Sequence, residues 1–166
     1  MKNFEQCKYT YAHKKIIEFM LPKYIQDENV LGVMLDRVKN HDMDKMTAYL
    51  FWDVLPCHKI HRDSMPHHAK SIECERVLYD YIEMVFDWES ARYSKPDKPL
   101  NAYDTLYKYY PTMEEYILPI LKEFGIAEPN LPFDEEILDF ANQVKVNITE
   151  EDIKNEVIEY IHRITK

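Results

Sequence analysis

Apolar residues along most of this chain recur every three or four positions, which is the spacing of one face of an α-helix. In the segment "FEQCKYTYAHKKIIEFMLPKY" that face carries Tyr9, His13 and Met20, so a histidine lies on the inward side of the first predicted helix. In "ENVLGVMLDRVKNHD" the same spacing puts His41 on the apolar face. The pair His41-Asp42 is therefore expected to close the second helix and to face inward.

The helical pattern continues to the end of the chain, with breaks at proline-rich connections. A third helix, "DKMTAYLFWDVL", is expected to break at Pro56. A long helix is expected over about 69–93, with Pro66 suited to a first helical turn. Further helices are predicted in "NAYDTLYKYY", "PTMEEYILPILKEFG", "FDEEILDFANQVK" and "TEEDIKNEVIEYIHRI", the last two opened by the capping residues Asp134 and Thr149. With no convincing strand, the sequence predicts an all-α, single-domain bundle of about seven helices.

Composition and charge narrow the classes of function. The chain has 166 residues, which fits one domain, and only two glycines, Gly32 and Gly125. Rossmann fingerprints, P-loops and hairpin-rich sheets all need glycine at fixed positions, so these are disfavoured. The formal charge of −9 disfavours general binding of duplex DNA, which needs an excess of lysine and arginine. Binding of a small phosphate ester needs only a metal and one or two local cations, so this function remains compatible with the charge.

Cysteine usage and hydropathy indicate the compartment. The three cysteines, Cys7, Cys57 and Cys74, are scattered and form no C-x-x-C pair, so neither a zinc ribbon nor a disulfide framework is expected. The N-terminus lacks the apolar core of a signal peptide, and no stretch approaches 18 apolar residues. We expect a reduced, cytoplasmic protein that does not interact with a membrane.

Histidines and acidic residues gather in "NHDMDKM", residues 40–46, in "MPHH", residues 65–68, and on the predicted long helix. Each has an ordinary explanation when taken alone. His13 can be a satisfied core histidine, His41-Asp42 can simply end a helix, and His67-His68 can lie in an exposed loop. Together, imidazoles and carboxylates without nearby thiolates favour Mn, Fe, Co, Ni or Zn over a structural Cys-type zinc site. One or two divalent transition metals are therefore the expected cofactors.

The order of these residues carries a family resemblance. An inward histidine, then His-Asp at a helix end, then clustered histidines, then an aspartate on a later helix resembles the HD-domain metal-dependent phosphohydrolase superfamily. The segment "HDMDK" is similar to the H-D-x-x-K form of its motif, with Lys45 at the lysine position. The match covers roughly residues 9–91, just over half of the chain.

A closer resemblance is to a small family of phage and bacterial proteins with the same HD-like layout. It combines an early histidine, H-D-x-x-K, a histidine shortly before a His-His pair, and E-M-x-x-D-W. Here these are His13, "HDMDK", His61 with "MPHH", and "EMVFDW". One departure is Met65, because asparagine is expected ahead of Pro-His-His. If the protein is phage-encoded, its location is the host cytoplasm.

The resemblance implies an HD-domain-like fold over residues 1–166, with the metal-site core in about 9–92 and C-terminal helices in about 103–166. Glu83 would orient a ligand histidine. Because adjacent helical residues diverge by about 100°, only one of His67 and His68 is expected to face the site. The implied metal ligands are His13, His41, Asp42, His61, His67, His68 and Asp87.

The implied function is a metal-dependent phosphohydrolase that acts on a nucleotide or another small phosphate ester or anhydride through metal-activated water. Asp42, Lys45 and His67 are the implied catalytic residues. Lys45 would neutralise charge on phosphoryl oxygens or hold the Asp42 carboxylate, and His67 would hold a second metal or protonate the leaving oxygen.

Two other functions stay open. Some HD-fold enzymes use the same ligands for O₂ chemistry, so a di-iron oxygenase is the second hypothesis. The third is a non-catalytic protein in which the metal staples the helices, such as a phage accessory protein that binds a host partner. The tail from about Asn130 is expected to form a lid or a dimer element rather than core, and a homodimer stays open.

Overall fold

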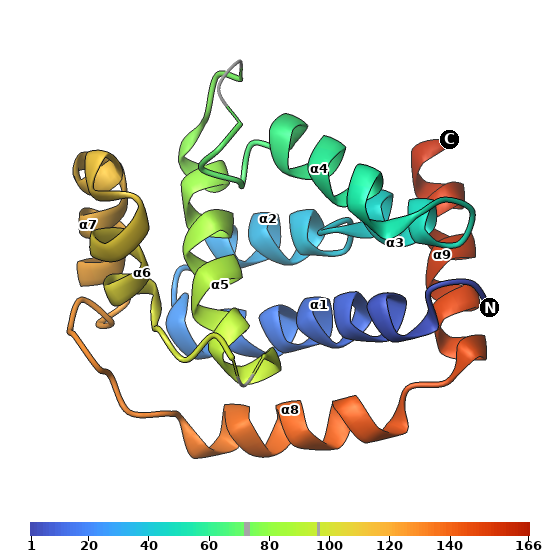
Figure 1. Cartoon of the computed structure of the whole chain (residues 1–166). Coiled ribbons are helices and arrows are strands. Elements are labelled where there is room, and N and C mark those ends of the chain that lie inside the picture. Colours follow the sequence, from blue (N-terminus) through green and yellow to red (C-terminus); the bar gives the residue numbers. More distant parts are fainter. Residues whose placement is uncertain (72–73, 96) are drawn as a thin grey trace.

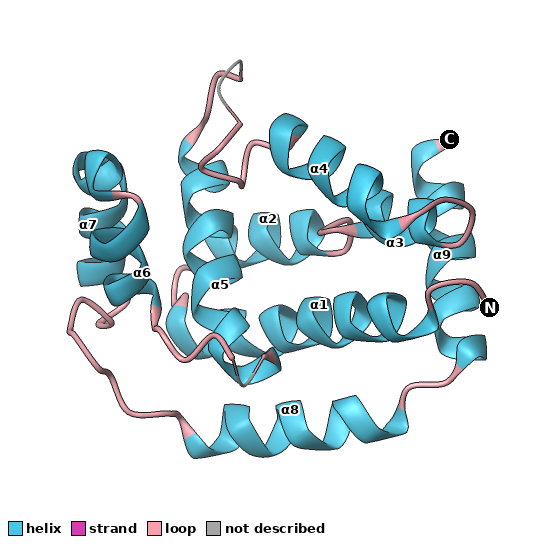
Figure 2. Ribbon diagram, in the orientation of Figure 1, coloured by secondary structure: helices cyan, strands magenta, loops and turns pink. Residues whose placement is uncertain are grey.

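The computed structural model describes residues 1–71, 74–95 and 97–166, and this part of the chain is all-helical, as expected (Figures 1 and 2). None of the helices in these ranges is long and apolar enough to cross a membrane. The helices are α1 (Phe4–Tyr24), α2 (Glu28–Val38), α3 (Met43–Tyr49), α4 (Val54–Ser64), α5 (Leu78–Ser94), α6 (Ala102–Tyr109), the short 3-10 helix η1 (Pro111–Met113), α7 (Glu114–Glu123), α8 (Glu135–Asn147) and α9 (Glu150–Ile164).

Helix α1 lies in the middle of the molecule and organises the core. It packs against α2 on one side, α8 on another, and α5, which crosses it (Figure 1). Burial of apolar side chains from these helices drives this arrangement. The larger buried cluster includes Ile16, Ile17, Met20 and Leu21 from α1 and Met84, Val85 and Phe86 from α5.

Helix α4 begins close to Pro56, where the sequence predicted that a helix would break. Pro56 lies in the first turn of α4, because the new helix begins at Val54. The first four N–H groups of a helix have no intrahelical acceptor, so a proline costs little there. The sequence predicted that a helix would end at Pro56, and this was wrong. A helix begins at Val54, includes Pro56 in its first turn and carries His61.

Helix α5 begins at Leu78, so the prediction of a helix from about Ala69 was wrong. Residues 65–71 form turns held by the guanidinium of Arg76. That group donates hydrogen bonds to the carbonyl oxygens of Pro66 at 2.8 Å and His68 at 2.8 Å, and also to that of Ser71. The backbone forms single turns here, in which the N–H groups of His68 and Ser71 donate to the carbonyl oxygens of Met65 and His68. The sequence pattern did not reveal the contact with Arg76. Pro66 accordingly begins no helix.

The C-terminal helices belong to the core, in contrast to the expected lid or dimer element. Ile137 and Ala141 of α8 are fully buried in the larger cluster. Ile153 and Val157 of α9 are buried in a second cluster that contains Cys7, Met43 and Met46. The tail after Asn130 thus contributes apolar surface to the same interior as α1 and α3.

Candidate metal centre

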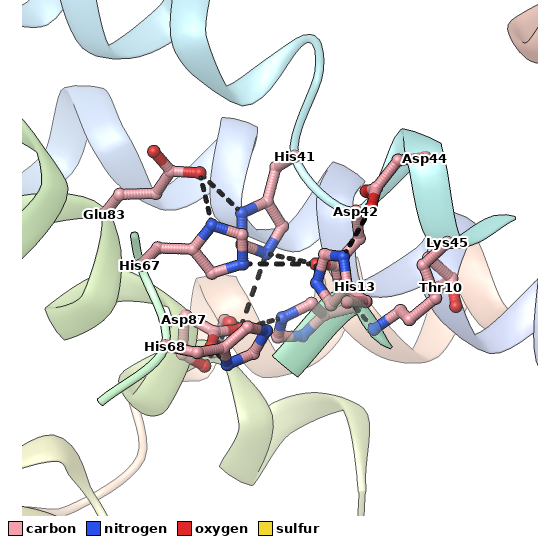
Figure 3. A network of polar contacts seen from close by, with 12 residues as sticks. Thr10, His13, His41, Asp42, Asp44, Lys45, His67, His68, Glu83 and Asp87 are labelled. Atoms are coloured by element: carbon pink, nitrogen blue, oxygen red, sulfur yellow. Dashed lines mark hydrogen bonds and ion pairs between the residues drawn. The ribbon is translucent and has the colours of Figure 1, made fainter. Parts of the chain in front are cut away.

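The histidines and carboxylates that the sequence singled out lie together where five segments meet (Figure 3). His41, His67, Asp42 and Asp87 point toward one another, and His13 and His68 adjoin them (Figure 3). All but two of these side chains are buried. The segments are α1 with His13, the turn after α2 with His41 and Asp42, α4 with His61, the turn at 65–71 with His67 and His68, and α5 with Glu83 and Asp87.

A tight turn between α2 and α3 places His41 and Asp42. Helix α2 ends at Val38, and Asp42 has φ 58° and ψ 10°, in the left-handed region. This conformation costs an L-residue roughly 1–2 kcal/mol, although Asp tolerates it better than most residues do. The chain reverses there, so two consecutive side chains can both face the cluster. Strained backbone of this kind persists where its surroundings over-determine it, often at functional sites.

Glu83 fixes the orientation of two histidine rings. Its Oε1 atom lies 2.9 Å from Nδ1 of His41 and 3.3 Å from Nδ1 of His67. Its Oε2 atom accepts hydrogen bonds from Arg37, at 3.2 Å from Nε and 3.1 Å from Nη2. A carboxylate that accepts the Nδ1 proton leaves the Nε2 lone pair free, which is how metal-binding histidines are commonly oriented.

Some residues that orient the histidines were not predicted. Asp44 lies 2.8 Å from Nδ1 of His61, and Ser90 and Ser94 each lie 3.3 Å from Nδ1 of His13. Ser90 follows Asp87 by three residues on α5, so helical spacing could have identified it. Asp44 lies within "HDMDK", but its partner is 17 residues away on an unpredicted helix, and no local pattern joins them.

Five buried polar atoms without a hydrogen-bond partner converge at the centre of the cluster. Among the described residues six buried side-chain atoms lack a partner, and five of them are here: Asp42 Oδ1 and the Nε2 atoms of His41, His61, His67 and His68. Nε2 of His61 lies 2.8 Å from Asp42 Oδ1, and that of His67 lies 3.3 Å from it. Each unsatisfied buried group costs about 1–3 kcal/mol, so a cluster of five calls for a ligand. A bound cation would satisfy them, because a carboxylate oxygen and the unprotonated nitrogen of an imidazole each offer a cation a lone pair.

The donor atoms form three overlapping groups, of which two share Asp42 and the third joins His41, His67 and Glu83. Within each group the ligand atoms lie within 4.8 Å of one another. Asp87 joins the group that contains His13, since its Oδ1 atom is 2.7 Å from Nε2 of that residue and 3.4 Å from Nε2 of His41. Each of the two groups that share Asp42 could hold a metal ion, and Asp42 belongs to both. These two groups are His13, His41 and Asp42, which we term position 1, and Asp42, His61, His67 and His68, which we term position 2.

Both His67 and His68 face the cluster, contrary to the expectation that only one would. Their ring centroids are 4.4 Å apart, and that of His68 is 4.9 Å from that of His61. The expectation assumed helical geometry, in which neighbours diverge. Residues 65–71 form turns instead, so the two side chains can share one direction.

The charges around Asp42 keep this residue ionised. Burial opposes its ionisation, but Nζ of Lys45 lies 2.7 Å from Oδ2, and together with His41 it holds the pKa of Asp42 well below its ordinary value. Burial lowers the pKa of His68 to about 3, so this imidazole is neutral at physiological pH. A carboxylate with one free oxygen and a neutral imidazole are the protonation states that metal binding requires.

The cluster opens toward solvent at Asp87 and His68. The side chains of these residues are 14% and 17% exposed, whereas those of the other predicted ligands are at most 6% exposed. A cavity of about 440 Å³ adjoins the cluster between α3 and α4. Its polar end is formed by Asp44, Lys45 and His61, and its apolar wall by Ala48, Trp52, Pro56, Cys57 and Ile60.

No family model, curated protein or solved structure matches this chain. The HD-domain resemblance therefore stays a prediction that rests on the motifs themselves. What the structure contributes is a buried His/Asp cluster with the donor set and spacing to hold a metal ion.

Proposed function

We propose that this protein is a metal-dependent phosphohydrolase that acts on a nucleotide or another small phosphate ester or anhydride. The observation that carries the proposal is that four unpartnered buried histidine nitrogens gather around Oδ1 of Asp42, in two groups that share this carboxylate. Histidine nitrogens with carboxylate oxygens suit Mn, Fe, Co, Ni or Zn. Two ions bridged in this way are the arrangement of many phosphate-cleaving enzymes.

In the proposed hydrolysis, Lys45 and His67 have different roles. Divalent ions at these positions would act as Lewis acids and activate water. Lys45 holds Oδ2 of Asp42 and thereby directs Oδ1 to the centre, and its ammonium also places positive charge beside incoming phosphoryl oxygens. His67 is better suited to ligation than to protonating a leaving group, because Glu83 occupies its Nδ1 and its Nε2 faces Asp42.

The open side distinguishes this centre from a purely structural staple. Structural metal sites are closed by protein ligands, whereas catalytic sites keep one position open. Here Asp87 and His68 reach solvent, and the cavity between α3 and α4 is lined by Lys45 and by His61, a member of position 2. Lys45 favours hydrolysis over oxygen chemistry, because a fixed ammonium complements phosphoryl oxygens and has no evident use in activating O₂.

The proposal is tested by assaying the full-length protein, loaded with Mn²⁺ or with redox-inert Zn²⁺, against nucleoside mono-, di- and triphosphates and p-nitrophenyl phosphate. We expect phosphate release that disappears in Lys45→Met, a variant that keeps most of the apolar stem. Hydrolysis with Zn²⁺ would exclude a need for redox chemistry. A metal-loaded protein that releases no phosphate from any of these, yet consumes O₂ in its iron form, would contradict the proposal.

A further inference from the structure

Lys95 lies near His13, a member of position 1, and has no role in the proposed hydrolysis. Lys95, the residue that follows α5, has its ammonium 4.2 Å from the centre of the Tyr9 ring. The Tyr9 ring stacks on that of His13, with centroids 5.9 Å apart and an interplanar angle of 17°. Lys95 is therefore separated from a predicted metal ligand by one aromatic ring.

The ammonium of Lys95 has no acidic partner among the residues that the structure describes. Other lysines near the cluster are neutralised: Lys45 is paired with Asp42, and Lys14 with Glu156 and Glu18. The contact with Tyr9 uses the aromatic face and leaves the three N–H donors of Lys95 without an anionic acceptor. A half-buried, unpaired ammonium retains the capacity to bind an anion.

Several cations surround the same place in a chain of net charge −9. His58 on α4 shows the effect of these charges, because burial together with Lys45, Arg62, His61 and Lys95 lowers the pKa of His58 to about 4. The acidic groups that act on Lys95 are Asp97 and Asp87, and Asp87 is already paired with His13. The surroundings of Lys95 therefore favour a negatively charged ligand.

We propose that Lys95, seated on Tyr9, binds a second anionic group of the substrate, beyond the phosphoryl group at the metal centre. This inference rests on the proposed function and deepens it by naming the substrate class. The substrate would carry two anionic groups, as in a phosphoanhydride or in a phosphate ester with a further phosphate. A substrate with a single phosphate would not use Lys95.

The inference is tested with the full-length, Mn²⁺-loaded protein and two probes, inorganic pyrophosphate and inorganic phosphate, by titration calorimetry. Lys95→Met keeps the apolar stem on Tyr9 and removes the charge. We expect it to weaken pyrophosphate binding about 10-fold and phosphate binding less than about 2-fold, as for the loss of one charge-assisted hydrogen bond. Lys95→Arg should retain most of the affinity, and Lys98→Met, an exposed lysine three residues away, should behave as wild type.

Two results would overturn the proposal that Lys95 binds a second anionic group. One is unchanged pyrophosphate affinity in Lys95→Met, which would make the contact with Tyr9 merely structural. The other is equal weakening for both probes, which would place Lys95 at the first phosphoryl group. Metal content and phosphate release are measured on the same samples. A wild-type protein that binds no metal, or that is metal-loaded but releases no phosphate, would refute the proposed function itself.

Discussion

Helix α5 carries two buried acidic clusters, and they differ in how their polar atoms are satisfied. In the C-terminal half of the helix, Glu89 accepts a hydrogen bond from the backbone N–H of Ala102 at 2.8 Å and one from Nη1 of Arg92 at 3.2 Å. Arg92 also donates to the carbonyl oxygen of Leu131 and lies 4.1 Å from the Phe133 ring. Both oxygens of Glu89 therefore have partners within the protein, and one atom, Nε of Arg92, is left without one.

The cluster around Glu83 and Asp87, which precede Glu89 by six and two residues, is comparably buried, but some of its polar atoms have no partner. Its outer atoms are paired, as in the contacts of Glu83 with His41 and Arg37, whereas its inner atoms are not. Burial of charge alone therefore does not indicate function in this protein. The indicator is that unpartnered atoms of several side chains share one direction and one centre.

The largest expected effect is a loss of stability when the paired cluster of Glu89 and Arg92 is changed. Glu89→Gln removes the negative charge opposite Arg92 and leaves a buried guanidinium without a counter-charge, so the free energy of unfolding should fall by about 3–5 kcal/mol. Metal content should not change, because Glu89 does not contribute to the candidate centre. Urea unfolding and metal quantification on one preparation check both statements. Loss of metal from a folded Glu89→Gln protein would contradict the claim that only the cluster around Glu83 and Asp87 binds metal.

A smaller effect is expected on metal affinity, and it should distinguish position 1 from position 2. His61→Ala removes a ligand from position 2 and none from position 1, so its affinity for the second ion should fall more than about 10-fold. We expect two equivalents of metal in the wild type and one in this variant, measured after dialysis. His162→Ala, an exposed histidine on α9, should retain both. Simultaneous loss of both ions in His61→Ala would show that the positions are not independent.

The smallest effect tests a second satisfied cluster, between α1 and α9. Glu156 pairs with the buried Lys14, and its Oε2 atom lies 3.6 Å from Lys15. Burial opposes ionisation, but the two ammonium groups hold the pKa of Glu156 below its ordinary value of about 4.5. The resulting stability is present above pH 4.5 and is lost as the pH falls through the lowered pKa.

Glu156→Gln should therefore cost about 1.5 kcal/mol at pH 7 and less at lower pH. Thermal unfolding across the range from pH 3 to pH 7 measures this, with Glu151→Gln, an exposed acidic residue on the same helix, as control. An equal loss at every pH would assign the effect to packing rather than to charge.

Most of the helices, and the inward position of His13, were predictable because they follow local periodicity. His13 on an apolar face needs only the helical repeat, and it is found there. His41 and Asp42 do not close α2 as expected, because that helix ends at Val38 and the pair lies in the turn before α3. The exact arrangement of 65–71 was not predictable, because Arg76 holds its carbonyls from outside the segment. Contacts of that kind depend on tertiary structure rather than on neighbouring residues.

The same reason explains why partners of the candidate ligands were missed. Asp44 meets His61 only because α3 and α4 pack together, and α4 begins beside a proline that the sequence alone suggested as a break. The left-handed conformation of Asp42 is likewise set by the turn around it. The sequence therefore indicates which residues gather, whereas the structure indicates which of their atoms remain free.

The most direct test of the central claim is metal quantification by mass spectrometry on purified wild type and Asp42→Asn. Asparagine tolerates the left-handed backbone of position 42, so the fold should survive while the shared carboxylate is lost. Asp36→Asn, the same change at an exposed residue of α2, is the control. We predict two equivalents of a transition metal in the wild type and in the control, and none in Asp42→Asn. Equal metal content in all three proteins, or none in the wild type after incubation with Mn²⁺ or Fe²⁺, would contradict the account.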